Sequence, residues 1–256
     1  MDLSGKVIVV TGAGSGIGEA MARRFARESP AALVLVDLNG SAAESVAGEL
    51  GATARQMDVS DAESNRDLIE YVEDAHGPVD LFCANAGIGV AGDEQSNPEE
   101  WDRMWQVNLM SHVHAAKHLI PGWVARGSGY FLSTASAAGL LTNLKAAQYS
   151  VTKHAAIAFA EWLAVTYGDK GVKVSCLCPM GVDTPFVRAA EEFEDLLGPH
   201  LIEPSAVADS VVRGIAEESF LILPHPEVGK FFQNKANDYD RWISGMQRLQ
   251  ESVFPD

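Results

Sequence analysis

Basic residues are scarce in this sequence, and their scarcity limits the surfaces that the protein can bind. The 256 residues include 19 lysines and arginines against 35 aspartates and glutamates, which gives a formal net charge of -16. Nucleic acids and anionic membrane surfaces both bind through basic patches. The charge balance therefore predicts that neither is a partner, and solubility is the simplest reason for the acidity.

The sequence also lacks the residue patterns of a leader segment, a membrane span, disulfides or a metal site. No apolar run approaches the length of a membrane span, and the first residues do not follow the charged-then-apolar pattern of a signal peptide. Only three cysteines occur, and Cys83, Cys176 and Cys178 each lie in an apolar run. The seven histidines have no partners at metal-ligand spacing. We therefore expect a cytoplasmic protein with buried free thiols, no membrane segment and no metal.

Short apolar runs rich in β-forming residues alternate with longer helical patterns along most of the chain. The strand-like runs cover residues 6–10, 32–36, a short run ending at 57, 79–84, 130–134, 172–177 and 220–223. The helical patterns cover residues 16–28, 41–50, 61–76, a long region after 98 with an expected break at Pro121-Gly122, 148–168 and 205–217. Repeated β-α units predict one α/β domain over residues 1–256, with a parallel sheet covered by helices on both faces.

The first expected strand runs into a glycine-rich turn that opens the first helix. Glycine lets a backbone turn tightly and approach a pyrophosphate, and a helix N-terminus offers that group free N–H donors. The glycines are Gly12, Gly16 and Gly18, with an extra one at Gly14. They do not fit the pattern Gly-x-Gly-x-x-Gly, because that frame would end on Ile17. A purely structural turn is the alternative, but its position between strand and helix favours dinucleotide binding.

The second expected strand ends at Asp37, 19 residues beyond Gly18. A carboxylate at this place can accept hydrogen bonds from the adenosine ribose hydroxyls, and it repels a 2′-phosphate. Ala13 and Ser15 within the glycine turn supply no cation to offset this repulsion. A solvated turn aspartate is the simpler alternative. Together with the glycine turn, however, Asp37 indicates a ribose contact and a preference for NAD.

A tyrosine and a lysine lie four residues apart in the expected helix 148–168. Such residues share a helix face, so the phenol of Tyr149 and the ammonium of Lys153 point into the same space. Tyrosine ionises near pH 10, and a nearby cation lowers its pKa by about one to three units. Taken alone, the pair would be a surface coincidence. Ser136 lies 13 residues before Tyr149, just beyond an expected strand.

Together these motifs resemble those of the short-chain dehydrogenase/reductase family in its compact single-domain form. The landmarks run from Thr11 to Thr184, and the glycine turn matches the family's Thr-Gly-x-x-x-Gly-x-Gly. Asp58-Val59 resembles the pair that contacts the adenine, and Asn85-Ala86-Gly87 resembles the segment that supports the sheet and borders the cofactor. The resemblance implies a Rossmann-type doubly wound fold. It also implies hydride transfer between a nicotinamide and an alcohol or carbonyl carbon.

The family's catalytic tetrad falls on Asn108, Ser136, Tyr149 and Lys153. By this resemblance Tyr149 exchanges the hydroxyl proton as the general acid or base, and Ser136 hydrogen-bonds the substrate oxygen. Lys153 is expected to lower the pKa of the tyrosine and to bind the nicotinamide ribose. Asn108 is expected to kink its helix and to hold a water that relays protons. An ordinary local hydrogen bond is the alternative for Asn108.

The expected dinucleotide site combines the glycine turn with the segments that the resemblance supplies. It consists of Gly12, Ser15, Gly16, Ile17, Gly18, Asp37, Leu38, Asp58, Val59, Asn85, Ala86, Gly87, Tyr149, Lys153, Pro179, Val182 and Thr184. One position departs from the family pattern, because Met180 replaces the glycine that usually follows Pro179. Val182 and Thr184 keep their places, so contacts to the nicotinamide carboxamide are still expected. Met180 is either a flexible apolar wall of the substrate pocket or a core residue.

Residues 184–204 follow a strand end and are expected to form the lid of the substrate pocket. Their acidic cluster is expected to be a solvated helix face. Arg188 is the only cation between Thr184 and Pro204, which argues against a phosphorylated or CoA-type substrate. Further candidates for the pocket wall are apolar: Val90, Ala91, Ala137, Leu140, Leu141 and Leu144. We therefore expect a small or medium-sized apolar secondary alcohol or ketone.

The tail, about residues 225–256, has apolar residues at the spacing of an amphipathic helix. They are Tyr239, Trp242, Ile243, Met246 and Leu249. This face packs either on the core of its own subunit or on a neighbouring subunit, and the sequence leaves both open. Members of the family are commonly tetramers, so we expect a homo-oligomer, and specifically a tetramer.

Two rival functions stay open. A ketoreductase acting on 3-oxoacyl or steroid-like carbonyls would share the whole tetrad, so only its substrate and cofactor preference would distinguish it. A catalytically silent NAD(H)-binding redox sensor would need no proton donor. The intact set of Ser136, Tyr149 and Lys153 therefore disfavours the sensor.

Overall fold

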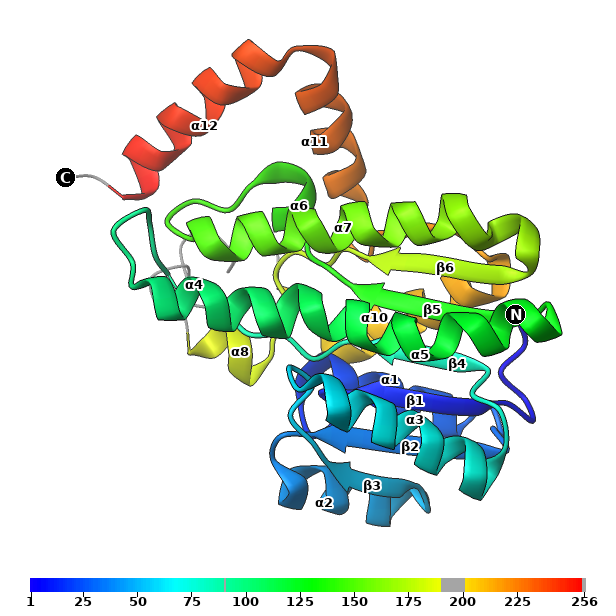
Figure 1. Ribbon diagram of the computed structural model, residues 1–256. Helices are drawn as coiled ribbons and strands as arrows, with labels where there is room; N and C mark the ends of the chain where they lie inside the picture. The colour runs from blue at the N-terminus through cyan, green and yellow to red at the C-terminus, as the bar shows by residue number, and fades with distance from the viewer. Residues whose placement is uncertain (90, 190–200, 255–256) are drawn as a thin grey trace.

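In the computed structural model, which describes residues 1–89, 91–189 and 201–254, seven strands form one sheet. Their order is β3-β2-β1-β4-β5-β6-β7, and every neighbouring pair is parallel (Figure 1). The strands are β1 (Val7–Thr11), β2 (Ala32–Asp37), β3 (Thr53–Gln56), β4 (Leu81–Ala84), β5 (Gly129–Thr134), β6 (Val172–Leu177) and β7 (Leu221–Ile222). The parallel sheet expected from the β-α alternation is confirmed.

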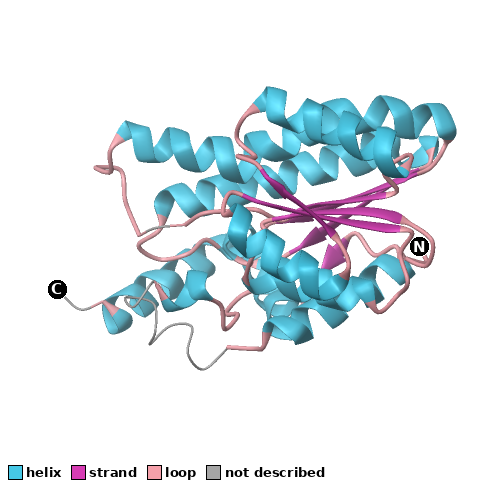
Figure 2. Cartoon of the chain, turned by 90° about the horizontal axis from the view of Figure 1, so that it is seen from below, coloured by secondary structure: helices cyan, strands magenta, loops and turns pink. Residues whose placement is uncertain are grey.

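Helices cover both faces of the sheet, as Figure 2 shows. Within the described residues they are α1 (Gly16–Ala26), α2 (Gly40–Leu50), α3 (Ala62–His76), α4 (Pro98–Trp105), η1 (Gln106–Met110), α5 (Ser111–Arg126), α6 (Ala138–Leu141), α7 (Ala147–Tyr167), η2 (Gly168–Lys170), α8 (Pro185–Arg188), α10 (Pro204–Glu217), α11 (Pro226–Asn237) and α12 (Tyr239–Val253). None of them is long and apolar enough to cross a membrane.

The central strands are apolar throughout because both of their faces are covered. Side chains alternate between the two faces of a strand. In β1, Val7 and Val9 join the core under α3, α5 and α7. Ile8 and Val10 join the core under α1, α2 and α10. Burial on both faces explains why the strand is a continuous apolar run and not an alternating one.

The expected helix break at Pro121 is wrong, because α5 runs through this residue. A proline removes the hydrogen bond to the carbonyl four residues earlier. That carbonyl belongs to Lys117, which is exposed and can be solvated, while Trp123 beyond the proline is buried in the core. The irregularity lies instead in η1 (Gln106–Met110), a π-helical turn between α4 and α5 that contains Asn108.

The carboxyl ends of the strands meet at one edge of the sheet because all strands run in the same direction. The loops after β1, β2, β4, β5 and β6 therefore gather at this edge, where ligands of open parallel sheets bind. These loops carry the glycine turn, Asn85-Ala86-Gly87, Ser136 and Pro179. Asp37 is the last residue of β2. The fold thus brings together segments that are far apart in the sequence.

The C-terminal helices α11 and α12 extend away from the sheet and its covering helices in Figure 1. Val228 and Lys235 of α11 are buried, whereas α12 has no buried residue. Trp242 of α12 is partly buried against the core, but Tyr239 and Ile243 are 58% and 47% exposed. Packing on the core of the same subunit therefore accounts for α11, and it leaves most of the apolar face of α12 exposed.

Candidate active site

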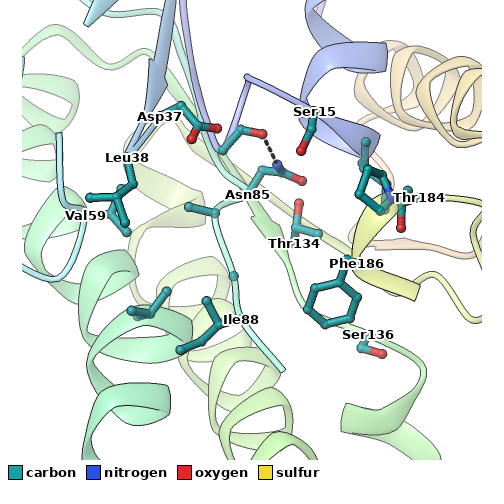
Figure 3. Close-up of a pocket in the computed structure, with 18 of the residues that line it drawn as sticks. Ser15, Asp37, Leu38, Val59, Asn85, Ile88, Thr134, Ser136, Thr184 and Phe186 are labelled. Atoms are coloured by element: carbon teal, nitrogen blue, oxygen red, sulfur yellow. Dashed lines mark hydrogen bonds between the residues drawn. The ribbon is translucent and has the colours of Figure 1, made fainter. Parts of the chain in front are cut away.

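A cavity of about 450 Å³ opens at the carboxyl edge of the sheet (Figure 3). Every residue of the predicted dinucleotide set lines it, and so does Ser136, whereas Asn108 does not. The other lining residues are Met57, Ser60, Ile88, Arg103, Val107, Thr134, Ala135, Met180, Pro185, Phe186 and Val187. The segments predicted from separate motifs therefore share one pocket.

The glycine turn approaches its neighbours too closely for any side chain. A Cβ atom on Gly18 would lie 2.0 Å from the carbonyl oxygen of Gly12. Gly12 itself has a φ of +64°, and a Cβ there would lie 2.9 Å from the Cα of Ala86. The Asn85 amide, in the loop after the neighbouring strand β4, fastens this turn. Its Nδ2 donates to the carbonyls of Thr11 at 2.9 Å and Gly12 at 3.4 Å, and Figure 3 draws the bond to Gly12. The turn is thus a narrow backbone cradle.

The start of α1 faces the same pocket. Ser15 precedes the helix, and its side chain caps none of the first N–H groups. Gly16, Ile17 and Gly18, which carry these N–H groups, all line the cavity. Free N–H groups at a helix N-terminus attract anions, so this end of the pocket suits a pyrophosphate.

Asp37 is held in place by backbone donors on both sides. Its Oδ2 accepts from the N–H of Gly14 at 2.9 Å, and its Oδ1 accepts from the N–H of Asn39 at 2.9 Å. Leu38 beside it is 57% exposed at the pocket rim. The sequence did not predict that the N–H of Gly14 holds Asp37, although the extra glycine at this position was an indication. A Cβ on Gly14 would lie 3.0 Å from Oδ2 of Asp37.

Ser136, Tyr149 and Lys153 meet at the other end of the pocket. The Nζ of Lys153 donates to the carbonyl of Thr134 at 3.0 Å and lies 5.6 Å from the ring centroid of Tyr149. The hydroxyl of Ser136 accepts from the N–H of Ala138 at 3.1 Å. Lys153 is 3% exposed and Ser136 is 7% exposed. Thr134 was not predicted, because the feature that matters is its backbone carbonyl.

Burial is the largest influence on the pKa values of Tyr149 and Lys153 in the free protein. It raises the pKa of Tyr149, and the hydrogen bond with Ser136 acts in the opposite direction. Burial also lowers the pKa of Lys153 to about 8. The net direction for Tyr149 is thus opposite to the one expected from a nearby cation alone. In this state the tyrosine is a protonated phenol at neutral pH.

Asn108 lies behind the pocket and is completely buried. Its Oδ1 accepts from the N–H of Ile88 at 2.9 Å, and its Nδ2 donates to the Ile88 carbonyl at 2.9 Å and to Oγ1 of Thr152 at 3.1 Å. These bonds are not the local ones of the simpler alternative, since they tie the loop after β4 to α7. A Cβ on Gly87 would lie 3.2 Å from both Oδ1 of Asn108 and Nζ of Lys153. Asn108 therefore lies close to the lysine without reaching the cavity.

The substrate end has an apolar wall from the segment after β6. The ring of Phe186 in α8 lies with its centroid 6.0 Å from that of Tyr149. Met180 lines the cavity and also packs against the core, so both interpretations of this residue apply. Residue 90 and residues 190–200, which include part of the expected lid, lie outside the described residues.

Several expected wall residues do not line this cavity. Ala91, Ala137, Leu140, Leu141 and Leu144 are all absent from its lining. All but Ala91 are buried instead, because α6 lies directly against α7. A Cβ on Gly139 of α6 would lie 2.5 Å from the carbonyl oxygen of Lys153. Elsewhere, within the part of the chain that the structure describes, no three His, Cys, Asp or Glu residues gather as metal ligands would.

Known proteins share this sequence pattern. A family model described as "short chain dehydrogenase" matches residues 6–195. The chain is 31% identical over 253 residues to the 1-deoxy-11-beta-hydroxypentalenate dehydrogenase of Streptomyces exfoliatus, covering 95% of this chain and 92% of that relative. It is 30% identical over 227 residues to the cyclohexanol dehydrogenase of Acinetobacter sp. strain SE19, covering 85% of this chain and 90% of the relative.

The fold has a close counterpart among solved structures. A crystal structure of a short chain dehydrogenase/reductase from Burkholderia phymatum in complex with NAD matches it with a TM-score of 0.87. The two sequences are 28% identical, and the match covers 94% of this chain and 96% of the other. The glycine cradle and the Asp37 carboxylate fit a nicotinamide dinucleotide, since both line the cavity at the edge where such ligands bind.

Proposed function

The chain belongs to the short-chain dehydrogenase/reductase family, and from this premise we propose that it is an NAD-dependent dehydrogenase of apolar secondary alcohols. Membership makes the protein an oxidoreductase that acts on CH–OH groups and takes a nicotinamide dinucleotide. The observation that carries the proposal of NAD and an alcohol is a single pocket, with Asp37 at one end and Ser136, Tyr149 and Lys153 at the other.

The dinucleotide would lie along the loops at the carboxyl edge. The N–H groups at the start of α1 would hold the pyrophosphate, and Asp37 the adenosine ribose. Asp58-Val59 would border the adenine, and Lys153 the nicotinamide ribose. Pro179, Val182 and Thr184 would hold the carboxamide. When bound, NAD supplies the acceptor for the hydride that leaves the alcohol carbon.

The proton of the alcohol is handled by the chain's own residues. The phenolic oxygen of Tyr149 takes the hydroxyl proton as the C–H bond breaks, and it returns a proton in the reverse reaction. Burial raises the pKa of this tyrosine, so the charge of Lys153 and the positive nicotinamide would have to lower that pKa for the phenol to act as a base. Ser136 donates a hydrogen bond to the substrate oxygen and stabilises its developing charge.

Asn108 supports this proton transfer from behind the pocket. The π-helical turn at Gln106–Met110 departs from the regular α-helical bonding around this residue. We propose that a water at this turn links Lys153 to solvent, so that the proton taken by Tyr149 can leave the site. Asn108 would hold the turn in place through its bonds to Ile88 and Thr152.

The preference for NAD over NADP rests on Asp37. Two backbone N–H groups hold the Asp37 carboxylate, and Asp37 lines the pocket. The 2′-phosphate of NADP would be repelled there by the negative charge of the carboxylate. Because cells keep NAD mainly oxidised, oxidation of the alcohol is the proposed direction. Phe186, Met180 and Val187 give the substrate end an apolar lining. Cyclohexanol, named for the Acinetobacter relative, is therefore the first alcohol to test.

We also propose that the protein is a cytoplasmic homotetramer. Its three cysteines are free and buried, and Cys176 and Cys178 form a thiol–thiol hydrogen bond at 3.8 Å and no disulfide, as expected in a reducing compartment. Trp162 and Val165 of α7 are 54% and 84% exposed, which leaves an apolar face for a partner subunit. A monomeric mass in solution scattering would contradict the tetramer.

The test is a turnover assay with purified protein, NAD and a panel of secondary alcohols, diols and hydroxysteroids. NADH formation is followed at 340 nm in parallel with an NADP series. Turnover of one alcohol class with NAD supports the proposal. Turnover of hydroxysteroids in the NADP series alone would favour the ketoreductase. Tight NADH binding with no turnover of any compound would favour the redox sensor.

A further inference from the structure

Helix α11 reaches the substrate end of the pocket from outside through a histidine that precedes it. His225 is 2% exposed. Its Nδ1 accepts from the N–H of Met180 at 3.2 Å, and its Nε2 donates to the carbonyl of Gly181 at 3.0 Å. One imidazole thus bonds the backbone of two consecutive residues in the loop after β6. The loop that carries the Met180 wall is therefore fastened from the C-terminal segment.

The same helix fastens the loop after β5 through a buried lysine. Lys235 is 7% exposed, and its Nζ donates to the carbonyl of Leu140 in α6 at 2.7 Å. A lysine is almost never buried without a partner, because removing its charge from water is costly. An apolar side chain would fill the same space at less cost. The ammonium is therefore best explained by the groups that it meets, the Leu140 carbonyl and the ring of Tyr239, whose centroid lies 5.4 Å from Nζ.

These two loops are also bonded to each other next to Ser136. The N–H of Ala137 donates to the carbonyl of Pro179 at 2.8 Å, and the Ser136 hydroxyl lies 3.5 Å from the same oxygen. The hydroxyl also accepts from Ala138, the first residue of α6. Both contacts of α11 thus act on a small backbone unit that carries Ser136 and Met180. Neither His225 nor Lys235 lines the cavity.

We propose that His225 and Lys235 are positioning residues that set the substrate and nicotinamide end of the site and leave the pyrophosphate and adenosine end unaffected. His225 holds the Met180 wall, and so it governs how tightly the alcohol binds. Lys235 holds α6, and so it governs where the Ser136 hydroxyl meets the reacting oxygen. The kinetic part of this inference rests on the proposed function, whereas its structural part does not.

The experiment compares His225→Phe and Lys235→Met with matched variants. His225→Phe keeps a ring but removes both hydrogen bonds. Lys235→Met keeps an unbranched side chain, one atom shorter, but removes the ammonium. Lys230→Met is the control, because Lys230 is an exposed lysine of the same helix. His225→Gln and Lys235→Arg retain donors and test rescue. His225→Asn, which keeps the acceptor for Met180 but is too short for Gly181, serves if His225→Phe does not fold.

Hydrogen–deuterium exchange gives the first readout and needs no turnover. In Lys235→Met, amide exchange in peptides covering residues 137–141 is expected to quicken about tenfold. In His225→Phe, amide exchange in peptides covering residues 179–182 is expected to quicken about tenfold. His225→Asn is expected to quicken the second set about threefold. Exchange in peptides covering residues 11–18 should stay within twofold of the wild type, and so should exchange throughout the control variant. The affinity for ADP-ribose, which has the pyrophosphate and adenosine but no nicotinamide, should also stay within twofold.

Steady-state kinetics on the alcohol that the wild type oxidises gives the second readout. His225→Phe is expected to raise KM about tenfold with kcat within threefold. Lys235→Met is expected to lower kcat about tenfold with KM within threefold, and each conservative variant should recover most of the loss. A lower melting temperature without local change in exchange would overturn the inference. A loss of ADP-ribose affinity as large as the loss of alcohol turnover would overturn it as well. If the wild type oxidises no alcohol, the proposed function fails and the exchange data decide the positioning roles alone.

Discussion

The two ends of the pocket are held together in different ways. At the dinucleotide end, the backbone packs on itself: Gly18 touches Gly12, and Asp37 is bonded to the N–H of Gly14. At the substrate end, side chains from distant parts of the sequence hold the loops, with Lys235 bonded to a carbonyl 95 residues away. Few substitutions fit where backbone packs on backbone, as in the glycine turn. A side chain that holds a loop by a hydrogen bond can be replaced without rebuilding the loop. The first end therefore preserves the cofactor, and the second can vary with the substrate.

Removing the phenolic hydroxyl of Tyr149 should give the largest difference between the effect on turnover and the effect on dinucleotide binding. We expect Tyr149→Phe to lower kcat roughly 10³-fold, because the proton acceptor is lost while the ring remains. The affinity for NADH, measured by fluorescence titration, should stay within about twofold. Tyr167→Phe at the far end of α7 is the matched control and should keep full activity. Substantial turnover by Tyr149→Phe would contradict the assigned role.

The buried lysine should make stability depend on pH in a direction that can be worked out. The pKa of Lys153 is about 8 in the folded protein and near 10.5 when exposed, so between these values the unfolded chain binds more protons. Stability therefore rises with pH across this window. Relative to Lys153→Met, the wild type should gain about 2 to 3 kcal/mol of unfolding free energy from pH 7 to pH 10.

Urea unfolding of both proteins at the two pH values measures this difference. Lys230→Met, which removes an exposed lysine, should show no such trend relative to the wild type. A flat difference between the wild type and Lys153→Met would mean that Lys153 titrates in the fold as it does in water.

The carboxylate at the dinucleotide end should control cofactor choice alone. We expect Asp37→Ala to raise the KM for NAD and to reduce the preference for NAD over NADP by about tenfold, equivalent to about 1.4 kcal/mol. The kcat with saturating NAD should change little. Glu44→Ala, which removes an exposed acid of α2, controls for net charge. Unchanged discrimination in Asp37→Ala would remove the basis for the NAD assignment.

The smallest effect is expected where the chain departs from its family. Met180→Gly removes an apolar wall but keeps the peptide groups that His225 holds. The KM for a small alcohol should rise about threefold, while larger alcohols should gain relative to it. The affinity for NADH should not change. An equal loss for alcohols of every size would mean that Met180 serves the core and not the pocket.

The comparison also explains how much of the molecule could be predicted from its sequence. The strands, the glycine turn and Asp37 depend on local patterns. The family resemblance supplied the rest of the dinucleotide set, and all of that set lines one cavity. The path of α5 through Pro121 could not be predicted, because it depends on tertiary packing around Trp123. Likewise, Leu140 and Leu141 face the core because of the way α6 meets α7.

His225 was not predicted for a related reason. As one of seven histidines without metal-ligand spacing, it carries no local signal. Its partners are backbone groups about 45 residues earlier in the chain, and backbone groups are the same in every sequence. Only the fold shows that its ring lies against Met180 and Gly181.

The bond between Asn85 and the glycine turn has a consequence for the order in which the chain assembles during synthesis. The turn emerges from the ribosome early, but the amide that fastens the Thr11 carbonyl follows 74 residues later. β1 also lacks its β4 neighbour until then. A shorter nascent chain thus carries the cradle's sequence without its support. Affinity for the dinucleotide should therefore arise only after β4 has joined the sheet. Cofactor binding is then a late step of folding and does not nucleate it.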